Sequence, residues 1–278
     1  MHFATMSAWL SPAKVSFVCS AHYLDHVEAV NLTTEQLALL KEIPDATFKE
    51  SVRDFMTNQQ FRRDYWIKGS RKLTTIEQAA QIKQHRLVLT SARDDISLKI
   101  AGALGEANLS EAIYGPVLDL MSDHKIRTVE EIALELTAIP YQKLAQSIIV
   151  LTGAGHLASV QTDDRISNAA PMAHKLNKEL INKAQFTNEI NYLASPVTGG
   201  AIEVNRVQQL FLLAIDKGKK HPQDWAQSAW TLFASQNQRL LKDGKAIETA
   251  DGNLEELTRQ AEQFASKRLP ILKALHVL

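Results

Sequence analysis

The chain has 278 residues, 45% of them hydrophobic, so it can bury a sizeable core and form two or three compact units. Its 31 basic and 31 acidic residues cancel, and a neutral surface lacks the long-range potential that attracts proteins to nucleic acid or anionic membranes. The single cysteine, Cys19, excludes an intramolecular disulfide and a cysteine-based zinc site, which favours a cytoplasmic location.

The chain begins with an apolar stretch, residues 3–17, that does not resemble an export signal. Ser11, Pro12 and Lys14 interrupt it, and it lacks a basic start and a cleavage-like end. No uncharged apolar run elsewhere reaches the roughly 20 residues that a membrane-spanning helix needs. We therefore expect no export signal and no contact with a membrane.

Residues 31–107 are predicted to form one α+β unit. A strand at 14–21 precedes it, a Thr33–Gln36 capping box opens its first helix, and one apolar face predicts a second helix at 46–57. We further expect a strand-like piece at 61–72, a helix opened by Thr74 and Glu77, strands at 86–91 and 96–101, and a linking turn at 102–108.

Residues 108–164 have the element order of a winged helix. Helices are expected at 109–122, after a Thr128–Glu131 capping box, and from Pro140. Glycines 153 and 155 should end the third helix, and 156–160 alternates like a strand.

Residues 165–278 are predicted to form a C-terminal helical unit with a β-hairpin. Its helices are expected at 171–184, 206–216, 225–241 and 254–274, and its hairpin within 191–205. The expected fold class is therefore α+β and predominantly α-helical, with a small α+β unit, a winged-helix-like unit and a helical unit.

The basic aromatic segment 61–72 is the first candidate for a binding surface. Alternating cations and rings can stack on a nucleic acid strand, but the neutral chain favours ion pairing with Asp64 and with other carboxylates brought near by folding. Arg62 and Arg63 could equally bind an acidic patch on a protein partner. The predicted helix from Pro140 carries one basic residue, Lys143, which is too few for reading DNA.

Signals for catalysis are weak. His22 and His26 flank Asp25 without a further nearby metal ligand, no Gly-x-Ser-x-Gly sequence is present, and Cys19 lies in an apolar strand. Ser195 precedes Pro196 and is first of all a turn residue. The Gly-Ala-Gly at 153–155 runs from a helix to a strand. A loop that binds a dinucleotide or S-adenosylmethionine needs the reverse order, a strand followed by the glycines and then a helix. We therefore assign no catalytic, cofactor-binding or metal-binding residue.

Several longer segments resemble the predicted regulatory domain that follows the catalytic domain in bacterial protein lysine methyltransferases. The segments are Arg-Asp-Phe at 53–55, Gln-Phe-Arg-Arg-Asp at 60–64, Gly-Ala-Leu-Gly-Glu-Ala at 102–107, Gly-Ala-Gly-His at 153–156, Leu-Ala-Ser-Pro-Val-Thr-Gly-Gly at 193–200 and Lys-Arg-Leu-Pro-Ile-Leu at 267–272. Together they extend over nearly the whole chain.

This resemblance implies an accessory, target-recognising region of a methyltransferase that uses S-adenosylmethionine (SAM). SAM is expected in the associated catalytic domain and not in this chain, which is expected to be non-catalytic by itself. Residues 1–30 would be the junction with, or the tail of, that domain. The implied partners are the catalytic domain and a protein substrate, with a homodimer left open and no nucleic acid.

Loop and charged residues are where recognition usually takes place. The candidate partner-binding residues are Arg62, Arg63, Trp66, Ser195, Thr198, Asn205 and Arg206. The alternative function is a winged-helix regulator that binds nucleic acid. A free-standing hydrolase or metal enzyme, which would depend on His22 or Ser195, is a third hypothesis.

Overall fold

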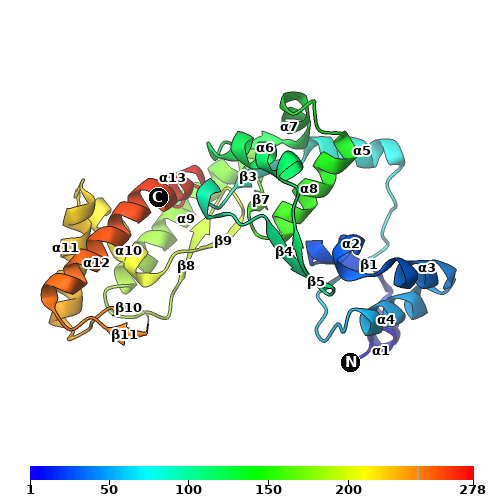
Figure 1. The fold of residues 1–278 in the computed structure, drawn as a ribbon, viewed down its shortest axis with the longest axis horizontal. Helices are drawn as coiled ribbons and strands as arrows, with labels where there is room; N and C mark the ends of the chain where they lie inside the picture. The colour runs from blue at the N-terminus through cyan, green and yellow to red at the C-terminus, as the bar shows by residue number, and fades with distance from the viewer. Residues whose placement is uncertain (243) are drawn as a thin grey trace. The chain divides into compact units, whose positions relative to one another are not determined.

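The computed structural model describes residues 1–242 and 244–278, which form two compact units, Met1–Ala158 and Ser159–Leu278 (Figure 1). Most of the described residues are in helices, and the strands form small sheets of two or three strands each. The expected fold class, α+β and predominantly helical, is confirmed. The finer division into four segments stays a prediction.

The N-terminal part of the first unit contains the predicted strand and both predicted helices. Its elements are α1 (Phe3–Leu10), η1 (Ser11–Ala13), β1 (Val15–Ser20), η2 (Tyr23–His26), α2 (Glu28–Asn31), α3 (Thr34–Glu42), α4 (Ala46–Met56) and β2 (Asp64–Lys68). The Thr33 hydroxyl accepts the Gln36 N–H at 3.3 Å, and the Gln36 side chain accepts the Thr33 N–H at 2.9 Å, so the capping box is confirmed. α1 was not predicted.

Strands β1 and β2 pair antiparallel into a two-stranded sheet. Phe17 lies opposite Trp66, and the register shifts between Phe17 and Cys19, so Val18 occupies a bulge. Phe3 of α1 packs on one face of this sheet, with its ring centroid 5.0 Å from that of Phe17 and 5.6 Å from that of Trp66. The ring cluster fixes α1 on the sheet.

The rest of the first unit surrounds a three-stranded sheet of order β6-β3-β7. Its elements are α5 (Thr75–Gln84), β3 (Arg86–Leu89), η3 (Arg93–Asp95), β4 (Lys99–Gly102), β5 (Gly105–Asn108), α6 (Glu111–Met121), β6 (Arg127–Thr128), α7 (Val129–Glu135), α8 (Tyr141–Gly153) and β7 (Leu157–Ser159). Side chains of β3, α6, α7 and α8 form its core, including the fully buried Leu87, Leu118, Ile132 and Leu151.

The expected linking turn at 102–108 is wrong. Gly105–Asn108 is a strand that pairs with β4, so that Gly102 lies opposite Gly105 in a tight hairpin. Gly105 has φ +108°, a backbone conformation that glycine adopts at little cost. The glycines that suggested a linker therefore make the turn between two paired strands.

The predicted order of three helices and a strand at 109–160 is present as α6, α7, α8 and β7. Helix α7 has its predicted Thr128–Glu131 capping box. Of the two glycines expected to end α8, Gly155 has a positive φ of +81°, while Gly153 is still helical. The winged-helix assignment itself stays a prediction.

The second unit consists of helices and the predicted hairpin. Its elements are α9 (Asp163–Lys183), β8 (Tyr192–Ser195), β9 (Gly200–Glu203), α10 (Arg206–Asp216), α11 (Pro222–Ser235), β10 (Leu241–Lys242), β11 (Lys245–Ala246), α12 (Ala250–Gln263), η4 (Phe264–Arg268) and α13 (Leu269–Ala274). The hairpin within 191–205 and the helix at 206–216 are confirmed.

Three helix boundaries in this unit differ from the prediction. α9 begins at Asp163 and not at Pro171, because Asp163 and Asp164 place negative charge in its first turn. Pro171 therefore lies inside the helix. α11 ends at Ser235, since Asn237 adopts a left-handed φ of +53°. The predicted helix at 254–274 contains a π-helical turn just before Pro270, which cannot donate a backbone hydrogen bond.

Candidate functional site

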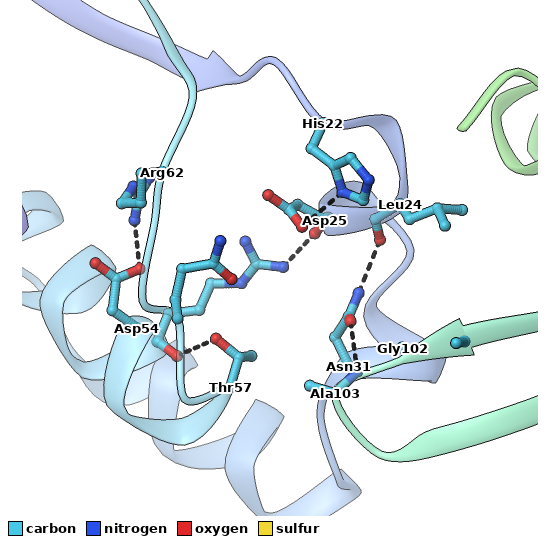
Figure 2. Close-up of a pocket in the computed structure, with 12 residues that line it drawn as sticks. His22, Leu24, Asp25, Asn31, Asp54, Thr57, Arg62, Gly102 and Ala103 are labelled. Atoms are coloured by element: carbon cyan, nitrogen blue, oxygen red, sulfur yellow. Dashed lines mark hydrogen bonds and ion pairs between the residues drawn. The ribbon is translucent and has the colours of Figure 1, made fainter. Parts of the chain in front are cut away.

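A polar pocket of about 250 Å³ lies in the first unit, between η2, α4 and the β4–β5 hairpin (Figure 2). Its lining residues are His22, Leu24, Asp25, Asn31, Arg53, Asp54, Thr57, Gln59, Arg62, Ala101, Gly102 and Ala103. The pocket thus combines segments up to 81 positions apart in the sequence, from His22 to Ala103.

Asn31 joins the segments that form one wall of the pocket. Its Nδ2 donates to the carbonyl oxygens of Leu24 at 2.7 Å and Val27 at 3.0 Å, and its Oδ1 accepts the Ala103 N–H at 3.1 Å (Figure 2). Asn31 is only 8% exposed, so these three bonds satisfy a buried amide. They hold the turn of the hairpin against α2.

Gly102 makes this close approach possible. A Cβ atom placed on Gly102 would lie 2.2 Å from the Val30 carbonyl oxygen, which no side chain can tolerate. The Leu104 N–H also donates to the Val30 carbonyl, at 3.1 Å. The backbone of the hairpin therefore lies directly on the C-terminal end of α2.

Asp25 is the carboxylate at the η2 side of the pocket. Its side chain accepts hydrogen bonds from Ser20 Oγ at 2.6 Å and pairs with His22 Nδ1 at 3.1 Å, while Arg53 donates to its backbone carbonyl oxygen. Burial alone would raise the pKa of Asp25, but the bonds from Ser20 and His22 outweigh it and lower that pKa. Asp25 is therefore ionised at neutral pH.

Arg62 forms the opposite side with three carboxylates. Its guanidinium group donates to Glu50 at 2.9 Å, Asp54 at 2.5 Å and Asp64 at 2.9 Å, with only 18% of the side chain exposed. The same group lies 4.5 Å from the centre of the Phe3 ring. Burial raises the pKa of Asp54, although Arg62 partly offsets this.

The charges that line the pocket balance one another, which suits a polar ligand. Arg53 and Arg62 contribute two positive charges, and Asp25 and Asp54 contribute two negative ones. Both arginines donate their hydrogen bonds to protein oxygens. A ligand group with hydrogen-bond donors would find acceptors here in the carboxylates of Asp25 and Asp54.

The predicted partner-binding residues near β2 are in different environments. Arg62 is the centre of the ion-pair cluster, and Trp66 is partly buried in the ring cluster with Phe3 and Phe17. Arg63 is exposed, and its carbonyl oxygen accepts the Ala21 N–H at 2.7 Å. Folding brings carboxylates to Arg62, as expected, so its guanidinium group is used inside the fold.

The predicted partner-binding residues of the second unit also make structural bonds. Ser195 is buried and donates to the Leu275 carbonyl oxygen at 2.7 Å, and its Oγ accepts the Thr198 N–H at 3.3 Å. Asn205 caps α10, and Arg206 donates to the Ala184 carbonyl oxygen at 2.7 Å. Whether any of these residues contacts a partner stays a prediction.

Sequence reasoning missed four residues that shape the pocket: Asp25 as a pocket-lining carboxylate, Asn31, Asp54 and Gly102. Asp54 and Gly102 do lie in segments that carry the family resemblance, Arg-Asp-Phe and Gly-Ala-Leu-Gly-Glu-Ala. Their place in those segments was the one feature of the sequence that could have indicated Asp54 and Gly102. Asn31 follows no pattern, because its three partners are defined only by the folded chain.

The described residues form neither a metal-binding cluster nor a membrane-spanning helix. Residues 1–242 and 244–278 contain no group of three or more His, Cys, Asp or Glu side chains placed to hold a metal ion. His26 Nε2 instead lies 2.9 Å from the Ser20 carbonyl oxygen. No helix in the described part of the chain has the length and hydrophobicity to cross a bilayer.

Comparison with known proteins gives a family for the N-terminal part. Residues 1–68 match the family described as predicted methyltransferase regulatory domain, which confirms the resemblance for that segment. The uncharacterized protein sll1526 of Synechocystis is 34% identical over 278 residues, covering 99% of this chain and 54% of the relative. The chain therefore spans about half the length of the curated relative that it matches.

A solved structure has a similar fold. PKMT2 from Rickettsia typhi, in complex with AdoHcy, matches with a TM-score of 0.53 and 14% sequence identity. The match covers 99% of this chain and 58% of that chain. At this identity the likeness establishes a shared fold and nothing further.

Proposed function

We propose that this chain, whose residues 1–68 match the predicted methyltransferase regulatory domain, is the accessory, target-recognising region of a SAM-dependent protein methyltransferase, acting on lysine. The observation that carries the proposal is the extent of that match. It runs from α1 to Lys68, the last residue of β2, and so includes the whole β1–β2 sheet with its packed helix.

The lengths of the similar proteins support a division of labour. This chain accounts for 54% of the Synechocystis relative and for 58% of PKMT2, the protein solved with AdoHcy. We assign the methyl-donor site to the part that this chain does not cover. In that arrangement the catalytic domain transfers the methyl group, and this region binds the protein to be methylated.

The loops of this chain do not fit SAM. Such a cofactor needs a strand that leads through a glycine-rich loop into a helix N-terminus, whose N–H groups face the ligand. Gly153 and Gly155 lie between α8 and β7, in the reverse order. Across the described residues, no strand is followed by two glycines and then a helix.

The polar pocket is where we place contact with the target protein. Its two lining carboxylates, Asp25 and Asp54, can accept hydrogen bonds from a lysine or arginine side chain. Asp25→Asn removes one negative charge and leaves the Arg62 ion pairs intact. We expect this variant to raise the KM for the protein substrate several-fold with little change in kcat.

The test of the proposed function is a methyl-transfer assay with radiolabelled SAM. The part of the Synechocystis relative that this chain does not cover supplies the enzyme, and a soluble bacterial extract supplies protein substrates. Adding the 278-residue chain should raise incorporation into protein several-fold. No change in rate or in the set of labelled proteins would contradict the proposal.

Calorimetry tests the cofactor assignment separately. Titrating SAM into the 278-residue chain should give no binding in the micromolar range, because no strand among the described residues leads through two glycines into a helix. Micromolar binding would show that the chain has its own SAM site. That result would overturn the division of labour while leaving a methyltransferase role in place.

We assign residues 108–164, the winged-helix-like segment, to protein contact, and we place the protein in the cytoplasm. On α8 the exposed residues are Tyr141, Gln142, Lys143, Gln146 and Ile149. A single cation on that surface favours a protein over a nucleic acid as its partner.

A further inference from the structure

The β1–β2 sheet has one covered and one bare face. Phe17 and Trp66 point to the covered face, where Phe3 packs on them. Tyr65 and Ile67 alternate with Trp66 along β2 and therefore point to the other face. Tyr65 is 58% exposed and Ile67 is 45% exposed.

The bare face is more apolar than a sheet face exposed to water usually is. In an antiparallel sheet with one solvated side, the outward positions are usually polar. Here Tyr65 and Ile67 occupy two of those positions, next to Ser16, which lies opposite Ile67. Val18, at the bulge of the neighbouring strand, is 46% exposed. Cys19, which pairs with Tyr65, is itself only partly buried.

The sheet is also small and open. In the described part of the chain each of its strands pairs only with the other, so both outer edges are free. A two-stranded sheet by itself is marginally stable in water, and its free edges can accept further strands. The covered face is stabilised by the ring cluster and by Arg62, whereas among the described residues neither Tyr65 nor Ile67 takes part in a ring or cation–π contact.

We propose, on the basis of the proposed function, that the face formed by Val18, Tyr65 and Ile67 binds the catalytic methyltransferase domain. The family match includes both strands and ends with β2, so this sheet is part of what defines a methyltransferase regulatory domain. A polypeptide as long as the Synechocystis relative has nearly half its length outside this chain, enough for the occupant. Tyrosine and isoleucine at the centre of such a face supply the apolar contact that a stable interface needs.

The surface is tested by co-expression with the uncovered part of the Synechocystis relative. The 278-residue chain carries the affinity tag, either as wild type or with Tyr65→Lys and Ile67→Lys together. The matched control is Ile76→Lys with Leu134→Lys, two exposed apolar residues of the same unit, at 84% and 71% exposure, outside the sheet. Circular dichroism and the thermal midpoint of each purified chain establish that it is folded.

We expect the relative's catalytic part to co-purify with the wild type and the control, and at least tenfold less with the Tyr65→Lys/Ile67→Lys chain. Equal recovery with that folded variant would overturn the surface assignment and leave the proposed function standing. No recovery with the wild type would contradict the proposed association itself. Sedimentation of the chain alone tests whether a second copy binds this face. If the wild type is a dimer and the Tyr65→Lys/Ile67→Lys chain is a monomer, a second copy covers the face and the inference is overturned.

Discussion

Arg62 links sequence, fold and pocket at the scale of a single residue. Its guanidinium group pairs with the carboxylates of Glu50, Asp54 and Asp64, and it lies over the Phe3 ring. Burial by itself would lower the pKa of Arg62, but the hydrogen bonds that its guanidinium group donates to Asp64 and Glu50 outweigh burial and raise that pKa, so the group is always charged. Without it, three carboxylates would be left close together in a partly buried position.

We predict that Arg62→Ala lowers the free energy of unfolding by about 3 kcal/mol, as expected when one partner of a largely buried ion pair is removed. The loss should shrink as the pH falls and Asp54, whose pKa is raised by burial, takes up a proton. Urea denaturation followed by circular dichroism measures the effect. Arg63→Ala, at the exposed neighbouring position, is the control, and an equal midpoint for the two variants would contradict the role of Arg62.

His156 gives the first unit a dependence on pH. Burial lowers its pKa in the folded protein, and its Nδ1 lies 3.2 Å from Ser91 Oγ. The unfolded chain, with an ordinary histidine pKa near 6.5, therefore binds more protons than the folded one just below that pH. The stabilising contribution is complete above about pH 6.5 and is lost as the pH falls through that value towards the lowered pKa.

We expect the thermal midpoint of the chain to fall between about pH 7.5 and pH 5.5, and to fall less in His156→Gln, which cannot take up the proton. A pH series of thermal denaturation curves measures both slopes. His2→Gln, at an exposed position, should behave like the wild type. Identical slopes for His156→Gln and the wild type would show that His156 does not contribute.

At the scale of elements, the β4–β5 hairpin defines the pocket because its backbone rests on α2. Figure 1 shows the hairpin reaching from the region of α6 and α8 to α2 within the first unit. Ile100, on β4, is buried in the main core, while Ala101, Gly102 and Ala103 line the pocket. The same hairpin therefore connects the three-stranded sheet region with the segment that matches the family.

We predict that Gly102→Ala costs about 2 kcal/mol of stability, because the added methyl group must displace the Val30 carbonyl. Hydrogen exchange should increase in residues 99–108 and in α2, since the Asn31–Ala103 bond lengthens with the displacement. Ala101→Ser, on the same strand and exposed, is the control. Unchanged exchange in both segments of Gly102→Ala would contradict this close packing.

At the scale of the whole molecule, charge separates the two main functional hypotheses. With 31 basic and 31 acidic residues the chain has no net charge at neutral pH. Several of the arginines are neutralised inside the fold, Arg62 by three carboxylates and Arg127 by Asp123. A chain without net charge has no surplus of cations for phosphate contacts, which supply most of the affinity of proteins for nucleic acid.

We therefore predict no gel shift of a short DNA or RNA duplex by the 278-residue chain at physiological salt, with at most a weak shift at low salt. Repeating the measurement over a series of salt concentrations checks this. A shift that persists at physiological salt and weakens with added salt would favour the winged-helix nucleic-acid regulator over the methyltransferase-associated role.

The sequence by itself determined the features that depend on neighbouring residues. The capping boxes at Thr33, Thr74 and Thr128 are confirmed, because each one joins residues only three positions apart. The hairpin at 191–205 and the predominantly helical class follow from similarly short patterns. The resemblance to a methyltransferase regulatory domain was also available from the sequence, since it rests on contiguous segments.

Only the tertiary structure decided which distant residues those segments contact. It joined Arg62 to Glu50 and Asp54, Ser195 to the carbonyl of Leu275, and Asn31 to Ala103. It also turned the expected linker at 102–108 into a strand and separated the covered from the bare face of the β1–β2 sheet. Such contacts join residues distant along the chain, and their free energy arises only when the whole unit packs, so no local pattern encodes them.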